Sequence, residues 1–305
     1  MNEPLRKYMK LGLVHWMAFP AVVKGDGPVV ETVTQVATDE FFDVLEVSWI
    51  TDPAARRQVA SIASTSRLEL YYGGMPRQKV TGLNINASDE TERRAAIDTL
   101  KQGIDEACEL NAKGFAFMSG KYAENATEQA FANLVASSDE LCAYAAEKGG
   151  MNVNLEIFDN AIEHRSLIGP VEIAKRYADA MAQRHANFGL MVDLSHLPQL
   201  GETPAQSLLP VKNHIRHAHI GNAFLQNPND PAYGDKHPRF GYPGAANDVD
   251  EIVDYLRTLF AAGYLKRDQS ARPVVSLEVR PVGDESPALV IANAKRTLQL
   301  AWDRV

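Results

Sequence analysis

Asn152-Val-Asn-Leu-Glu156 is a short, mostly apolar stretch that ends in a carboxylate, and it decides how the fold is interpreted. Three further stretches end in the same way: Leu190-Met-Val-Asp193, Ile215-Arg-His-Ala-His219 and Val274-Val-Ser-Leu-Glu278. Apolar runs of about four to eight residues between turn-forming residues are typical of buried strands. In a parallel α/β fold the reactive groups gather at the carboxyl ends of the strands. The ends of these four stretches therefore predict a divalent-cation site at one face of one sheet.

Strand-like and helix-like segments alternate along the whole chain. The expected strands cover Leu11–Phe19, Val44–Ile50, Leu68–Tyr72, Gly114–Met118, Asn152–Phe158, Phe188–Val192, Ile215–Ile220 and Pro273–Val279. The expected helices cover Val29–Glu40, Ala54–Ser66, Ala87–Asn111, Glu128–Lys148, Val171–His185, Ala205–Asn213, Asp248–Gly263 and Pro287–Arg304. Such alternation predicts a single α/β domain over residues 1–305, a (β/α)8 TIM barrel. A doubly wound sheet is the runner-up, but it needs a glycine-rich turn after the first strand, where this chain has Ala18-Phe-Pro-Ala-Val22.

The composition is that of an ordinary globular protein, with 45% hydrophobic and 23% charged residues. A net charge of −8 and the lack of a basic run argue against binding to nucleic acid or to an anionic membrane. No apolar run reaches the ~18 residues that a membrane span needs, so we expect a cytoplasmic protein. The two cysteines, Cys108 and Cys142, have no motif spacing and are expected to be free thiols.

One connection is much longer than the others. It covers residues 221–247, between the seventh strand and its helix, and it is rich in Asn, Asp, Pro and Gly. Loops of this length in a compact domain are usually functional or disordered. We interpret it as a substrate lid in which Lys236, His237 and Arg239 serve polar recognition or acid–base chemistry. An oligomer contact or a flexible excursion is the alternative.

The alternation of side chains along a strand predicts which of them point into the barrel. Asn152, Asn154 and Glu156 share one face of their strand, as do Ser276, Glu278 and Arg280 of the last one. Buried polar groups are costly unless they are paired or bind a cation. Three carboxylates and one imidazole favour Mn²⁺, with Mg²⁺ or Co²⁺ as alternatives, over a thiolate-type zinc site. A site with this excess of negative charge suits a neutral polyol whose oxygens replace water.

These motifs resemble those of the sugar isomerase/epimerase superfamily of xylose-isomerase-like barrels. The resemblance covers nearly the whole chain and is carried by Glu156, Asp193-Leu-Ser-His196, His217-Ala-His219-Ile-Gly221 and Glu278-Val-Arg-Pro281. It implies that Glu156, Asp193, His219 and Glu278 bind one divalent metal ion, often Mn²⁺. It implies a metal-dependent isomerase or epimerase that removes a proton next to the carbonyl of a keto sugar, through a metal-stabilised enediolate. In that mechanism Glu156 and Glu278 transfer the proton, and His196 contacts a substrate oxygen, with His237 as a further candidate acid or base.

The chain also departs from the ketose epimerases of this superfamily. They carry an arginine where this chain has Leu225, and a second glutamate where it has Ile162, although Glu163 and His164 lie next to that position. The departures leave room for a lyase, either C-glycoside deglycosidase-like or the catalytic subunit of a 3-oxo-glycoside eliminase, which would use the same metal site. An apurinic endonuclease-like barrel and a non-catalytic barrel are lesser alternatives.

Several side chains near the strand ends are candidates for binding a sugar or a sugar derivative. These are His15, Trp16, His196, Lys236, Arg239 and Arg280. For His15 and Trp16, packing in the core is the alternative. We expect no nucleic-acid or membrane partner, and the sequence leaves open a homo-oligomer or a small partner subunit.

Overall fold

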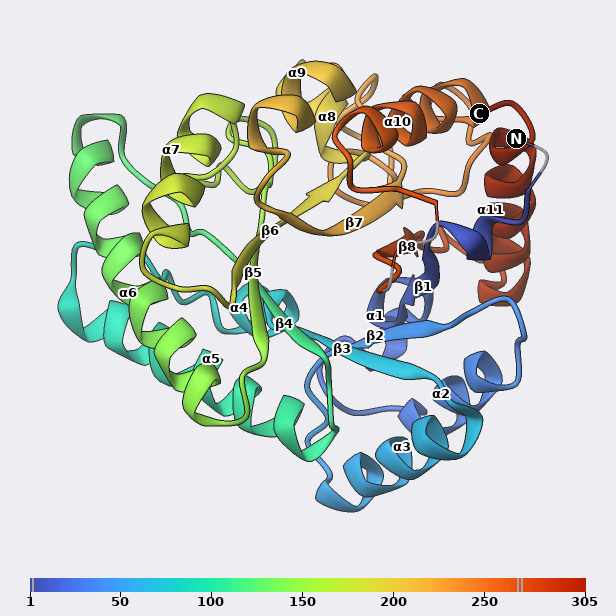
Figure 1. Cartoon of the computed structure of the whole chain (residues 1–305). Coiled ribbons are helices and arrows are strands. Elements are labelled where there is room, and N and C mark those ends of the chain that lie inside the picture. The colour runs from blue at the N-terminus through green and yellow to red at the C-terminus, as the bar shows by residue number, and fades with distance from the viewer. Residues whose placement is uncertain (2, 268, 270) are drawn as a thin grey trace.

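The computed structural model describes residues 1, 3–267, 269 and 271–305. Within these residues, eight parallel strands close into a barrel in chain order, and β8 pairs back onto β1 (Figure 1). The strands are β1 (Lys10–Val14), β2 (Val44–Val47), β3 (Glu69–Gly73), β4 (Gly114–Met118), β5 (Asn152–Glu156), β6 (Phe188–Asp193), β7 (Ile215–Gly221) and β8 (Val274–Glu278). The predicted TIM barrel is therefore confirmed, and the doubly wound sheet is wrong.

Helices follow the strands and surround the barrel (Figure 1). They are α1 (His15–Ala18), α2 (Val29–Ala37), α3 (Pro53–Ser66), α4 (Met75–Thr81), α5 (Glu90–Glu109), α6 (Thr127–Glu147), α7 (Val171–Ala182), α8 (His196–Leu200), α9 (Pro204–Leu208), α10 (Val249–Ala261) and α11 (Pro287–Trp302). Short 3-10 turns cover Leu5–Lys7, Pro20–Val22, Glu124–Ala126 and Leu209–Val211.

Acidic caps fix the start of several helices. The Asp52 carboxylate accepts the N–H of Ala54, and Pro53 occupies the first position of α3, as the sequence predicts. Asp89 caps α5 through the N–H of Glu92, and Asp248 forms a capping box with Glu251 at α10.

The first strand is shorter than predicted. It ends at Val14, and the next residues, His15–Ala18, form the short helix α1 instead of continuing the strand to Phe19. The helix predicted over Ala205–Asn213 is also wrong, because α9 ends at Leu208 and a 3-10 turn follows. The helices α4 and α8 were not predicted, since each is too short to show an apolar period in the sequence.

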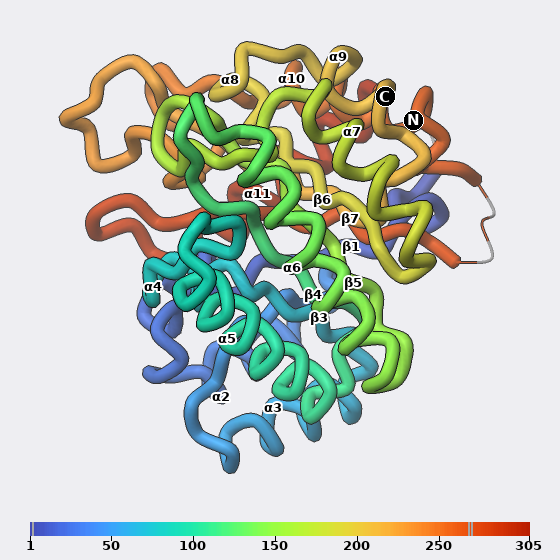
Figure 2. The backbone as a smooth tube through the Cα atoms, turned by 90° about the vertical axis from the view of Figure 1, so that its left-hand side faces the viewer, coloured from blue at the N-terminus to red at the C-terminus, as the bar shows by residue number. Residues whose placement is uncertain are grey.

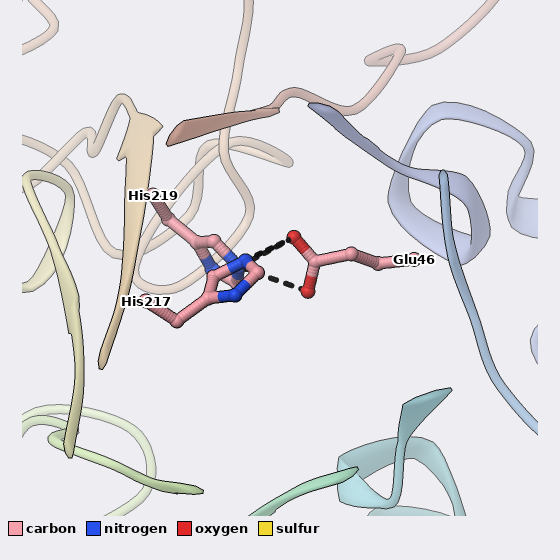
Figure 3. A group of neighbouring side chains, drawn as sticks. All are labelled: Glu46, His217 and His219. Atoms are coloured by element: carbon pink, nitrogen blue, oxygen red, sulfur yellow. Dashed lines mark hydrogen bonds and ion pairs between the residues drawn. The ribbon is translucent and has the colours of Figure 1, made fainter. Parts of the chain in front are cut away.

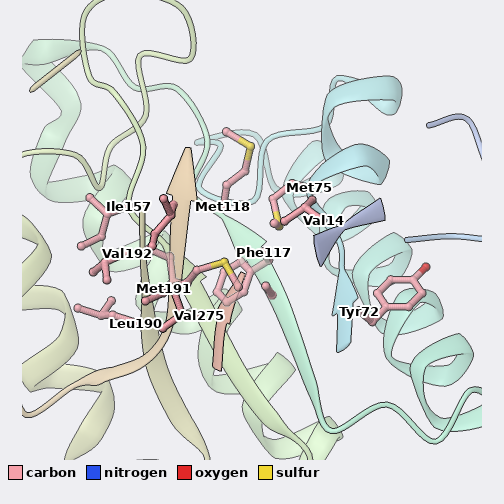
Figure 4. Packing of buried hydrophobic residues seen from close by; sticks show 14 of the residues in the cluster. Val14, Tyr72, Met75, Phe117, Met118, Ile157, Leu190, Met191, Val192 and Val275 are labelled. Carbon is pink, nitrogen blue, oxygen red and sulfur yellow. The ribbon is translucent and has the colours of Figure 1, made fainter. Parts of the chain in front are cut away.

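The apolar core lies between the barrel and its helices and also fills part of the barrel. Leu190, Met191 and Val192 of β6 belong to the same cluster as Phe117 of β4 and Val275 of β8 (Figure 4). The two cysteines are free thiols, as expected. Cys142 is fully buried in α6, and Cys108 is half-buried near the end of α5.

The long connections gather on one side of the barrel. In Figure 2 the segment between β7 and α10, residues 222–248, projects on the same side as α4, α8 and the segment that follows β8. This is the face at the carboxyl ends of the strands, where TIM barrels hold their active sites. No helix among the described residues is long and apolar enough to cross a membrane.

Candidate metal centre

Four strands deliver the predicted ligands to one point at this face. Glu156, Asp193 and Glu278 are the last residues of β5, β6 and β8, and His219 lies in β7 directly opposite Asp193 in the strand register. Their exposed fractions are 1% for Glu156, 2% for Asp193, 0% for His219 and 7% for Glu278. One ligand-type atom from each of the four residues lies within 4.8 Å of the other three. The structure thus brings together all four residues that the sequence singles out.

Each of these four side chains has one buried atom without a hydrogen-bond partner. The atoms are Glu156 Oε1, Asp193 Oδ2, His219 Nδ1 and Glu278 Oε2. His219 Nδ1 lies 2.6 Å from Glu278 Oε2, a contact without hydrogen-bond geometry, and 3.6 Å from Glu156 Oε1, which is too long for a hydrogen bond. Buried polar atoms are nearly always paired, so such a convergence calls for a bound group. A divalent cation fits it, because all four atoms are ligand donors and three belong to carboxylates.

The other atoms of these side chains are held in place. Asp193 Oδ1 accepts the N–H of Ser195 at 2.8 Å, which leaves Oδ2 free. His219 Nε2 lies 3.0 and 3.1 Å from the two carboxylate oxygens of Glu46 in β2. Figure 3 shows the imidazoles of His217 and His219 facing the same Glu46 carboxylate, and His217 Nε2 is 2.7 Å from it. Because a carboxylate accepts, His219 carries a proton on Nε2, so Nδ1 is the ring nitrogen that would bind a cation.

The electrostatics of the centre fit a cation. Burial raises the pKa of Asp193, and the neighbouring Glu278 carboxylate raises it as well. For His219, burial alone lowers the pKa, but Glu46 and Glu278 raise it well above its ordinary value. Close, buried carboxylates repel one another, and this repulsion is relieved by a bound positive ion.

Two more predicted residues, His196 and His237, lie beside this centre. His196 begins α8, and its Nδ1 is 2.6 Å from the carbonyl oxygen of Ile157, so that Nδ1 is a donor. His237 belongs to the long segment after β7 and has a left-handed backbone, with φ of 49°. Its Nδ1 is buried without a partner, 3.8 Å from Asp193 Oδ2. The structure therefore places both imidazoles at the metal centre, while their chemical roles stay predictions.

Asp235 joins these two imidazoles to the outer part of the site. Its Oδ1 lies 3.0 Å from His196 Nε2 and 2.8 Å from His237 Nε2. Its Oδ2 lies 2.7 Å from His164 Nε2 and 3.2 Å from Lys79 Nζ. Burial raises the pKa of Asp235, but these neighbours hold it well below its ordinary value. Burial lowers the pKa of His196 and His237, but facing carboxylates, including Asp235, raise it to about 10 and about 9.

The segment after β7 is also held by Glu163. The Glu163 carboxylate accepts the N–H of Asp235 at 2.7 Å and forms an ion pair with Lys236. Ile162 stands where the ketose epimerases carry a second glutamate. The two residues that follow it, Glu163 and His164, both contact Asp235. In this structure the segment predicted to be a lid places Asp235 and His237 beside the four candidate ligands.

The remaining predicted residues lie farther from the four ligands. His15 is 2% exposed, its Nε2 is 2.8 Å from Thr32 Oγ1, and burial lowers its pKa to about 3. Trp16 is 5% exposed and packs against Gly73. Arg239 donates from Nε to Glu285, and the backbone N–H of Arg280 donates to the carbonyl of His237. A part in substrate binding stays a prediction for each of them.

The sequence indicates Glu46 only as a side chain that could line the site, with packing inside the barrel as the alternative, and it does not single out Asp235. Glu46 stands out in Val44-Leu-Glu-Val47 as one acid in an apolar strand, and this is the sign that marks it as buried and paired. Asp235 lies in a polar loop, where nothing in the sequence distinguishes it from neighbouring Asn and Asp residues.

The sequence model of the xylose isomerase-like TIM barrel family matches residues 39–279. The chain belongs to this family. Among solved structures, the barrel is similar to a D-tagatose 3-epimerase-like protein, with a TM-score of 0.69 and 18% identity over 97% of this chain and 99% of that one. It is also similar to a 3-keto-D-glucoside 4-epimerase from E. coli, with a TM-score of 0.68 and 17% identity over 95% and 99% of the chains. An L-ribulose 3-epimerase gives a TM-score of 0.69 and 18% identity over 97% and 96%. No curated protein matches the chain in sequence.

Proposed function

We propose that this barrel is a divalent-metal-dependent sugar isomerase or epimerase, which removes a proton from the carbon next to the carbonyl of a keto sugar. The observation that carries the proposal is the convergence of four buried, unpartnered ligand atoms at the carboxyl ends of β5 to β8. Two of the similar structures named above are sugar epimerases by description and the third is described as epimerase-like, which supports the same class of substrate.

Glu156, Asp193, His219 and Glu278 would hold the ion, with Mn²⁺ as the first choice and Mg²⁺ or Co²⁺ as alternatives. When bound, such an ion polarises a carbonyl oxygen and stabilises the negative charge that develops there. His219 would bind through Nδ1, because Glu46 fixes the proton on Nε2.

Proton transfer falls to the carboxylates of Glu156 and Glu278. They come from β5 and β8, three strands apart around the barrel, so they approach a substrate at its mouth from different sides. One carboxylate takes the proton from the carbon and the other returns a proton to it or to its neighbour. Glu278 is the more exposed of the two and is the first candidate for the base. His196 would contact a substrate oxygen once Asp235 releases its Nε2.

A lyase that acts on a 3-oxo-glycoside is the second candidate, and one observation favours it. The long segment after β7 brings an additional imidazole, His237, to the metal centre, with its Nδ1 buried and unpartnered. In such a reaction the base removes the proton next to the ketone, and the electron pair left behind forms an enolate. The enolate expels the aglycone as a carbon–carbon double bond forms, and a group at this position gives the leaving group its proton.

Glu278→Gln tests the proposed proton transfer. The variant should lose exchange of solvent deuterium into the carbon next to the ketone by at least a factor of about 100, since general-base groups contribute roughly 10²–10⁴-fold. Exchange is followed by NMR with keto sugars and 3-oxo-glycosides in the presence of Mn²⁺, and Mn²⁺ binding of the variant is measured in parallel. Glu285→Gln, a carboxylate paired with Arg239, is the matched control. Unchanged exchange in a Mn²⁺-loaded Glu278→Gln protein would assign the base to another residue.

A further inference from the structure

A pocket of about 540 Å³ opens at the same face of the barrel as the metal centre, but it does not include the four ligands. Its walls come from the connections after β3, β4 and β5. They include Lys79, Asn84, Ser119, Lys121, Glu163 and His164. We call it the side pocket. Its volume falls in the ~300–1,000 Å³ range of ordinary small-molecule sites.

The carboxylate of Asp235 lies between the side pocket and the metal centre and contacts residues of both. Two residues of the pocket wall, Lys79 and His164, contact Oδ2 of this carboxylate. Its other oxygen, Oδ1, contacts His196 and His237 at the metal centre. A substrate oxygen that binds His196 Nε2 has to replace Asp235 there, and this displacement moves the carboxylate from between the two spaces.

The formal charges of the side-pocket wall balance, because two lysines, Lys79 and Lys121, stand beside two carboxylates, Glu92 and Glu163. Two of these groups are also paired with residues outside the wall, Lys79 with Asp235 and Glu163 with Lys236. The remaining wall contributes amide, hydroxyl and backbone groups, such as those of Asn84 and Ser119. This lining suits a neutral group with many hydroxyls better than a phosphate, because no net positive charge faces the pocket.

We propose that the side pocket is a second sugar subsite. The substrate is then a keto sugar that carries a second, neutral, hydroxyl-bearing ring through a glycosidic bond. The keto ring occupies the metal centre and the attached ring occupies the side pocket. This inference rests on the proposed function and narrows its substrate class from free keto sugars to glycosides.

The test compares 3-oxo-lactose, in which the ketone lies on the galactosyl ring, with 3-oxo-galactose, which lacks the attached glucose ring. Both are titrated by calorimetry into the full chain loaded with Mn²⁺. Wild type should bind 3-oxo-lactose at least tenfold more tightly than 3-oxo-galactose. Lys121→Trp places a large ring at the exposed rim of the side pocket, and it should weaken 3-oxo-lactose binding at least tenfold while 3-oxo-galactose stays within twofold. Lys212→Trp, at an exposed lysine outside the pocket wall, is the control and should change neither value.

The outcomes separate the subsite from the proposed function. Equal affinity of wild type for the two sugars would overturn the subsite alone, as would a Lys121→Trp protein that weakens both sugars equally or neither. Failure of wild type to bind either sugar would overturn the subsite, while the proposed function is tested separately by the deuterium exchange described above. If Lys121→Trp does not fold, Leu83→Trp fills the half-buried side of the same wall and gives the same readout.

Discussion

At the scale of single residues, Glu46 is the side chain through which β2 contacts His219 of the proposed metal centre. Replacing it by glutamine keeps the shape but removes the charge and allows the amide to present its N–H₂ to His219. We expect Glu46→Gln to weaken Mn²⁺ binding about 10- to 100-fold, the usual cost of losing a carboxylate behind a ligating histidine. Electron paramagnetic resonance of free Mn²⁺ measures the affinity, and the visible spectrum of the Co²⁺-loaded protein reports the altered ligand field. Glu69→Gln, in β3 and paired with Lys10, is the control. Equal affinity for wild type and Glu46→Gln would contradict the assignment.

A residue's place in the site could be predicted only where a local sequence pattern indicates it. The four ligands end or nearly end apolar strands, so their position in the chain already indicates a common face. The partner of His219 is found in β2, 173 residues away in the sequence, and no local pattern joins the two. Asp235 is brought to His196 by tertiary folding of an irregular segment, which periodicity does not describe.

At the scale of elements, Asp235 joins the segment of residues 222–248 to four side chains, those of Lys79, His164, His196 and His237. Asp235→Asn removes the charge that faces His164, His196, His237 and Lys79, so the segment should open more often. We expect trypsin to cleave after Lys236 or Arg239 at least several times faster than in wild type, as followed by mass spectrometry. Asp230→Asn in the same segment is the control, because Asp230 accepts from neutral donors, Tyr242 Oη and the N–H of Ala232. A cleavage rate that is the same in all three proteins would show that Asp235 does not hold the segment.

Some element boundaries differ from those that the residues' own secondary-structure propensity predicts. The apolar run at Leu11–Phe19 has the composition of one long strand, yet the barrel uses only Lys10–Val14. The rest turns into α1, which buries His15 and Trp16 against neighbouring elements. Helix starts were predictable where an acidic cap and a proline mark them, as at Asp52-Pro53.

At the scale of the whole molecule, a bound ion should stabilise the fold, because the unfolded chain cannot bring four distant strands together. At a Mn²⁺ concentration 100 times the Kd, the gain in unfolding free energy is about 2.7 kcal/mol. For a chain of this size that corresponds to a rise in Tm of roughly 5 °C, which chelator treatment should reverse. Differential scanning calorimetry measures the shift. Asp193→Ala should lose it, and Asp254→Ala, at an exposed position of α10, should keep it. The same Tm with Mn²⁺ and with chelator would contradict a metal site here.

The two thiols described above differ in their accessibility, so their modification rates report on transient opening of the barrel's outer layer. A thiol reagent meets Cys108 in the native state, but it reaches Cys142 only after α6 has lifted from its neighbours. Burial also raises the pKa of Cys142 to about 12, so the reactive thiolate is scarce until water arrives. The slow second modification therefore times the transient openings of the outer layer, without any added label.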